Sequence, residues 1–414
     1  MIKTCLGVLL AFASLGCSSD STPGANVAME VTLANSPLAR MQNVSLIRAG
    51  DSFTLAGYED GLVRWGRLSP NTLDGQLAYE TSFTPPEPLV GPAPVFAATM
   101  KVTPGDQLVA IGLTNSSTVS GGYNLSAIVQ TMGDALPAAP VVLATIEAGI
   151  DPNTVQIVAG AATSGNVGFV AWGIPVKGRT VNYLLLTADA KHADPALEVF
   201  DHNDPASVPN WECLTAANGA MGISFGVVIP QVNASGNIDS SDFRVFDIKE
   251  TGAKTDMTYP LSAVVTSCHI VGSPSSAGGY LMAFENSEGI GFATYTPSSD
   301  SAYAGNVATK DMAMPVATLG GPLNIQPPAW VSSASGGDVS IGISRTAGPE
   351  VFRFTYNAIP HGGTLTLRSE QGKTGPVASW VGSDAVYVTY ADQVSGSPSV
   401  KRYFMRIESP ATLP

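Results

Sequence analysis

Short runs in which apolar and polar residues alternate recur along nearly the whole chain. One clear unit begins at the small-residue turn 163–168, continues as the apolar run 169–172 and returns, after a polar hairpin, through the run 180–187. Runs of five to eight residues with a period of two, bounded by Gly, Asn and Ser, are strand signals. No window keeps the period of a helix. The pattern therefore predicts an all-β protein built from a repeated unit.

The unit recurs seven times, and each copy begins at a turn that contains glycine. These glycines are Gly50, Gly105, Gly165, Gly219, Gly279, Gly337 and Gly382. They are separated by 55, 60, 54, 60, 58 and 45 residues, which is about the length of one four-stranded blade. The repeat predicts a seven-bladed β-propeller of four-stranded antiparallel blades. It lacks the Trp-Asp dipeptide of WD repeats and matches no particular propeller family.

The count of strand signals predicts how the ring closes. Second strands are expected at 53–57, 108–113, 169–174, 223–229, 280–285, 339–344 and 385–390. Fourth strands are expected in six units only, at 76–83, 141–147, 196–200, 257–261, 312–318 and 364–368. The segment 29–33 is a strand signal without a unit of its own. Because an open propeller would expose a strand edge, this N-terminal strand is predicted to complete the seventh blade.

The first residues have the pattern of an export signal, because Lys3 precedes the apolar run 5–13, which is too short to span a bilayer. The segment 14–17, Ser-Leu-Gly-Cys, resembles the lipobox of bacterial lipoproteins. That resemblance implies cleavage before Cys17 and attachment of acyl chains such as palmitate to Cys17. Ser18 after the cysteine implies the outer membrane by the sorting rule of such proteins. The alternative is an ordinary secretory signal cleaved near Gly16.

These features divide the chain into a signal peptide at 1–16, a lipid-anchored tether at 17–27 and one propeller domain at 28–414. The 43 glycines and 30 prolines fall between the apolar runs and are therefore turn residues rather than signs of disorder. The net charge of −13 becomes about −14 without Lys3. An acidic chain disfavours nucleic acid as a partner. The expected partners are the membrane, through the lipid, and an envelope protein or glycan.

Two cysteines remain in the predicted propeller. Cys213 and Cys268 lie 55 residues apart, in the first strands of units four and five. In an oxidising compartment, two cysteines at equivalent places in adjacent blades are candidates for a disulfide. The alternative is a pair of buried thiols.

The candidate binding residues lie in the polar hairpins between second and third strands, which emerge on one face of a propeller. These hairpins differ in length and chemistry while the strands beneath them stay alike, as expected of a rigid scaffold that presents a variable surface. Solvent-exposed hairpins are, however, polar whatever their role. The candidates are Tyr58, Glu59, Asp60, Lys177, Arg179, Asn286, Glu288, Arg345 and Asp392.

No motif in the sequence predicts a cofactor or a metal. His192 and His202 lie near aspartates, but both stand in Asp-Pro turns, and no further pair of ligands completes a zinc set. His269 is expected to be a structural histidine. There is no G-x-S-x-G turn for a serine nucleophile, and a catalytic residue cannot be assigned.

Two functions from different classes fit these features. The first is a lipid-anchored binding or scaffold module of the cell envelope. The second is a polysaccharide hydrolase or lyase that uses carboxylates at the mouth of the channel. Glu59 and Asp60, with Asp392 of the neighbouring seventh unit, are the nearest candidates for an acid and a base. The absence of a repeated catalytic signature favours binding.

Overall fold

The structure is a computed structural model of the 414-residue chain. It describes residues 27–32, 38, 41, 44–49, 52–68, 79–99, 106–161, 168–175, 181–186, 197–198, 211–219, 222–249, 254–261, 264–272, 280–286, 289–298, 301–315, 329–331, 338–345, 348–355, 365–366, 372–374, 378–381, 385–394 and 400–408. The predicted signal peptide and the predicted tether, except Val27, which begins β1, lie outside these residues, so both stay predictions. Within them, no helix is long and apolar enough to cross a membrane.

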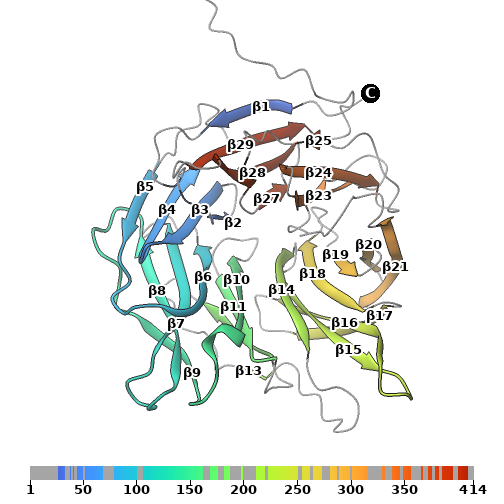
Figure 1. The fold of residues 1–414 in the computed structure, drawn as a ribbon, viewed down its shortest axis with the longest axis horizontal. Coiled ribbons are helices and arrows are strands. Elements are labelled where there is room, and N and C mark those ends of the chain that lie inside the picture. The colour runs from blue at the N-terminus through green and yellow to red at the C-terminus, as the bar shows by residue number, and fades with distance from the viewer. Residues whose placement is uncertain are drawn as a thin grey trace, which may run out of the picture.

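The described strands form seven antiparallel sheets, which Figure 1 shows arranged around a common centre. Sheets 1 to 6 each contain four strands that are consecutive in the sequence. Sheet 1 contains β2 (Val44–Ala49), β3 (Ser52–Glu59), β4 (Leu62–Leu68) and β5 (Tyr79–Phe83). Sheet 2 contains β6 (Val90–Thr99), β7 (Gln107–Asn115), β8 (Tyr123–Thr131) and β9 (Val141–Ile146). Sheet 3 contains β10 (Gln156–Ala161), β11 (Gly168–Gly173), β12 (Val181–Leu186) and β13 (Leu197–Glu198).

The next three sheets repeat this order of strands. Sheet 4 contains β14 (Glu212–Gly219), β15 (Gly222–Val232), β16 (Ile238–Lys249) and β17 (Lys254–Leu261). Sheet 5 contains β18 (Val265–Gly272), β19 (Tyr280–Asn286), β20 (Gly289–Ser298) and β21 (Ser301–Pro315). Sheet 6 contains β22 (Ala329–Val331), β23 (Asp338–Arg345), β24 (Gly348–Thr355) and β25 (Leu365–Thr366). A short 3₁₀ turn, η2 (Pro152–Thr154), precedes β10.

Sheet 7 combines the two ends of the chain. It contains β27 (Ala378–Val381), β28 (Ala385–Val394), β29 (Val400–Glu408) and β1 (Val27–Thr32), while β26 (Gly372–Thr374) pairs with the far end of β28. β1 runs antiparallel to β29, with Glu30 opposite Met405 and Thr32 opposite Tyr403. The strand predicted at 29–33 therefore occupies the outer position of this sheet, beginning two residues earlier than expected.

The inner strands of neighbouring sheets contact one another around the whole ring. β2 contacts β6, and the series continues through β10, β14, β18, β22 and β27 back to β2. Four-stranded antiparallel sheets that meet through their inner strands around a centre are the architecture of a β-propeller, so the predicted all-β propeller fold is confirmed.

The described core lies between neighbouring sheets, because alternate residues of one strand face opposite ways. In β11, Phe169 and Ala171 pack in the cluster shared with sheet 4, whereas Val170 and Trp172 pack in the cluster shared with sheet 2. All six residues of β11 are buried. A strand covered on both faces needs apolar residues at successive positions, which explains the continuous apolar run seen in the sequence.

A glycine permits the close approach of sheets 4 and 5. A Cβ atom at Gly226 of β15 would lie 2.8 Å from Ile270 Cδ1 and 2.9 Å from Phe243 Cε1. Real Cβ atoms do not approach other carbon atoms so closely, so a larger residue would require the side chains of Ile270 and Phe243 to move.

An ion pair joins sheets 1 and 2. Arg67 of β4 pairs with Asp106, which immediately precedes β7, and their side chains are 15% and 12% exposed. Burial lowers the pKa of Arg67 from its usual value, although the guanidinium stays charged at neutral pH. Each charge therefore depends on the other for compensation.

We expect Arg67→Ala to destabilise the protein by roughly 2 kcal/mol, between the cost typical of a surface pair and that of a fully buried pair, because Asp106 would lose its counter-charge. The measurement is the free energy of unfolding in urea. Arg64→Ala, on the same strand, is the matched control and is expected to cost less. Equal losses for the two variants would show that the ion pair does not stabilise the contact between the sheets.

Candidate functional site

The hairpins between second and third strands lie together, because the sheets of a propeller are related by rotation about its axis. We call this side the hairpin face. The loops between first and second strands and between third and fourth strands lie on the other side. β1 enters sheet 7 there, since Val27 pairs with Ile407 near the end of β29. We call this second side the tether face.

The first hairpin of the hairpin face is a tight turn between β3 and β4. Asp60 and Gly61 both have positive φ, 52° and 77°, as in the type I′ turns that suit two-residue hairpins. Tyr58 packs against the core cluster shared by sheets 1 and 2. Glu59 is half-buried and Asp60 is exposed. Of these three candidates, Asp60 is the one that is exposed rather than partly buried.

The hairpin between β7 and β8 is fixed by its own side chains. Ser116 Oγ accepts hydrogen bonds from the backbone N–H groups of Thr118, at 3.3 Å, and Val119, at 3.1 Å. The N–H of Gly122 donates to the carbonyl oxygen of Val119 at 2.9 Å. Ser117 is exposed beside them. The loop thus presents hydroxyl groups on an ordered backbone.

The hairpin between β15 and β16 is held in the same way by Asn233. Its Oδ1 accepts from the N–H groups of Ser235, at 2.9 Å, and Asn237, at 3.1 Å, and its Nδ2 donates to Asp239 Oδ2 at 2.9 Å. Asx turns of this kind fix the path of a loop. Two hairpins of different length and chemistry are therefore rigid at the same face.

The structure places the other predicted residues as follows. Asn286, expected in an exposed hairpin, is only 4% exposed, because it is the last residue of β19 and pairs with Val265. Arg345 ends β23 opposite Gly348, and Asp392 of β28 lies opposite Lys401. Lys177, Arg179 and Glu288, with His192 and His202, lie outside the described residues, as does Cys17.

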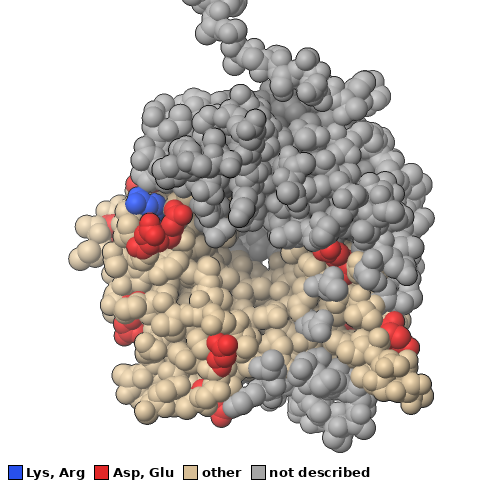
Figure 2. All heavy atoms as spheres, viewed as in Figure 1, with Lys and Arg blue, Asp and Glu red and all other residues tan. Residues whose placement is uncertain are grey.

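β27 of sheet 7 contacts β2 of sheet 1, so the two sheets that carry the candidate carboxylates are neighbours. His269 lies on β18, half-buried, opposite Ala283. Among the residues that the structure describes, no three His, Cys, Asp or Glu side chains are grouped so that they could hold a metal ion. Figure 2 shows acidic side chains in separate places on the described part of the visible face, which is hollowed near its centre.

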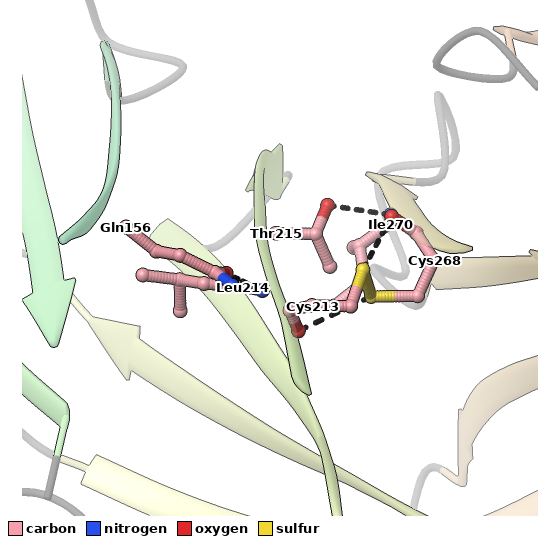
Figure 3. The surroundings of a disulfide bond; sticks show 6 residues. All are labelled: Gln156, Cys213, Leu214, Thr215, Cys268 and Ile270. Atoms are coloured by element: carbon pink, nitrogen blue, oxygen red, sulfur yellow. Dashed lines mark hydrogen bonds between the residues drawn. A yellow bond between two sulfur atoms is a disulfide. The ribbon is translucent and has the colours of Figure 1, made fainter. Parts of the chain in front are cut away.

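The inner strands of sheets 4 and 5 are joined by a disulfide (Figure 3). Cys213 of β14 and Cys268 of β18 are bonded, with their Cα atoms 5.9 Å apart. Each sulfur also lies close to the carbonyl oxygen of the other cysteine, at 3.2 and 3.3 Å. Because a disulfide sulfur carries no hydrogen, these are contacts and not hydrogen bonds. The predicted disulfide is present.

A bulge aims Cys213 at its partner. Glu212 pairs with Val228 and Leu214 with Val227, so that Cys213 has no partner residue on β15 and takes a φ of 49°. A bulge bends the strand and redirects a side chain. This bulge has no recognisable signal in the sequence.

Two side-chain hydrogen bonds continue the connection between inner strands (Figure 3). Gln156 Oε1 of β10 accepts from the N–H of Leu214 at 2.8 Å, and Thr215 Oγ1 accepts from the N–H of Ile270 at 3.2 Å. These residues join sheet 3 to sheet 4 and sheet 4 to sheet 5. These residues were not predicted from the sequence, although a polar residue within an otherwise apolar first strand is a signal that could have indicated such a role.

The comparisons with known proteins show the fold and no family. No family model matches the chain, and no curated protein matches its sequence. A structure described as "Crystal structure of polysaccharide lyase Uly1" is similar over 88% of this chain and 89% of that one, with 10% identity and a TM-score of 0.51. One described as "Structure of Dos1 propeller" covers 87% of this chain and 78% of its own, with 12% identity and a TM-score of 0.40. The chain is a β-propeller.

Proposed function

We propose that the protein is a lipid-anchored propeller of the cell envelope that binds a protein or glycan through its hairpin face. The observation that supports this function is the position at which β1 begins. Val27 begins β1 on the tether face, opposite the hairpins. A lipid on Cys17 would therefore leave the hairpin face free to meet a partner. The ordered loops at Ser116 and Asn233 supply a preformed surface, which lowers the entropy cost of binding.

The anchor is tested separately from the binding. Palmitate labelling should modify the full chain and should be lost in Cys17→Ala. With two or more acyl chains the labelled protein should remain in the outer-membrane fraction, because one chain gives only marginal anchoring. An unlabelled protein, released in soluble form from the envelope, would show that the signal is an ordinary secretory one.

Binding is tested by capture from solubilised envelope, with and without protease treatment to separate protein from glycan partners. The variant is Glu59→Gln with Asp60→Asn, since Asn tolerates the positive φ of that turn. We expect it to lose the captured partner without a change in Tm. Asp134→Asn, an exposed carboxylate on the tether face, is the matched control. Equal capture by all three proteins would place the binding surface elsewhere.

The second candidate is a polysaccharide hydrolase or lyase. It is kept because one structure that matches along most of both chains is described as a polysaccharide lyase. A glycosidase needs two carboxylates about 5 to 9.5 Å apart. Purified protein would be screened with envelope polysaccharides for new reducing ends and for unsaturated products. Activity lost in Glu59→Gln, Asp60→Asn or Asp392→Asn would favour catalysis, whereas capture without turnover favours binding.

A further inference from the structure

The loop between β8 and β9, residues 132–140, exposes an apolar surface. Its sequence is Met-Gly-Asp-Ala-Leu-Pro-Ala-Ala-Pro, in which Asp134 is the only charged residue. Leu136 is 78% exposed and Met132 36%, and Val142, at the start of β9, is 49% exposed. These are three of the five large apolar side chains that are exposed among the described residues. Leu136 and Met132 belong to the same nine-residue loop, and exposed apolar side chains on one loop favour a site of interaction.

The framework holds this loop in place. Two N–H groups of the loop donate to residues outside it. That of Met132 donates to the carbonyl oxygen of Asp106 at 2.8 Å, and that of Ala138 to the carbonyl oxygen of Val129 at 2.7 Å. The N–H of Gly133 donates to the hydroxyl of Tyr79, on the neighbouring sheet, at 3.2 Å. With both ends and its first turn bound, the loop holds Leu136 in solvent instead of folding it against the sheet.

The loop belongs to the tether face. It joins a third strand to a fourth, and β1 enters its sheet at that same side. Residues 18–26 would connect Cys17 to β1, a span of at most about 30 Å when extended. A lipid on Cys17 would therefore keep the tether face near the bilayer.

We propose that the β8–β9 loop rests in the surface of the bilayer, so that the propeller lies with its tether face on the lipid and its hairpin face away from it. This inference rests on the lipid anchor of the proposed function. Lipid suits the loop better than a second protein does, because the anchor would hold lipid beside it at a high effective concentration. At a high effective concentration of lipid, an apolar loop with only weak affinity for the bilayer still binds to it. The anchor then supplies attachment, and the loop supplies orientation.

The test uses the full lipidated chain in neutral phosphatidylcholine vesicles. Leu136→Cys is labelled with an environment-sensitive fluorophore, and vesicles with spin-labelled acyl chains serve as quencher. Ile238→Cys is the matched control, because Ile238 is a 43% exposed apolar residue beside the hairpin at Asn233, on the opposite face. The native cysteines of the mature chain are held in the disulfide or by the lipid, so labelling is specific.

We expect a blue-shifted emission and several-fold stronger lipid quenching at position 136 than at 238. If the protein floats with the vesicles but neither probe is quenched, the anchor stands and the docking of the loop is wrong. Stronger quenching at position 238 would also overturn the docking of the loop, because the hairpin face would then lie on the lipid. A blue shift at 136 without vesicles, increasing with protein concentration, would identify a second copy of the chain as the occupant. Failure to float would remove the anchor and this inference with it.

Discussion

A form of the protein that begins at residue 36 should unfold at a Tm at least about 5 °C below that of a form that begins at residue 25. The first form lacks β1, and the second retains it. β1 pairs with β29 through five residue pairs in sheet 7. At about 1 kcal/mol for each backbone hydrogen bond, loss of the ladder costs a few kcal/mol. It also exposes the edge of β29.

The two truncated forms are matched, because both lack the signal and the lipid. Leu38, which is fully buried and whose N–H donates to Glu80 Oε1 at 3.1 Å, is retained in both. The loss should appear as one cooperative shift of the whole transition, measured by calorimetry, since the two ends of the chain meet in this sheet. A peptide of residues 25–35 added in excess should restore part of the Tm by mass action. Equal Tm values for the two forms would mean that β1 does not stabilise the ring.

The strands could be predicted from the sequence because each blade buries both of its faces. The resulting apolar runs end at glycine and proline turns. The pattern of apolar residues within a run and the spacing of the turns therefore both indicate where the strands lie. The expected second strand at 223–229 is the centre of β15, and that at 385–390 opens β28. The pairing of the N-terminal strand with the seventh blade could be predicted by counting strands, because the seventh unit lacks a fourth strand of its own. The fourth strand expected at 312–318 was misplaced, because β21 begins at Ser301 and runs beside β20 for most of its length.

The details of the site could be predicted only in part. Cys213 and Cys268 could be paired because they stand at equivalent places in the repeat, but the bulge that turns Cys213 depends on strand register. Register also explains Asn286, which a polar sequence placed in solvent and the structure buries. The exposed Leu136 was missed, because an apolar residue between strand signals does not reveal whether the fold covers it.

Loss of the disulfide should destabilise the protein by roughly 4 kcal/mol, as the chain-entropy treatment gives for a closed loop of 55 residues. The variant is Cys213→Ala with Cys268→Ala, compared with the intact protein in urea with and without a reductant. Cys268 is 1% exposed and Cys213 is half-buried, so the reductant should act slowly, through the sulfur of Cys213. The free energy of unfolding of the double variant should be the same with and without the reductant.

The disulfide should stabilise the contact between the inner strands of sheets 4 and 5, in addition to constraining the unfolded chain. It lies beside the hydrogen bond from the N–H of Ile270 to Thr215, which also joins sheets 4 and 5. In the double variant we therefore expect faster amide exchange at Ile270, which would be measured by hydrogen exchange. Ile111, a buried residue of sheet 2, is the control position and should keep its exchange rate. If a thiol reagent titrates both cysteines in denatured, non-reduced protein, the bond is absent, and the contact between these strands depends on packing and hydrogen bonds alone.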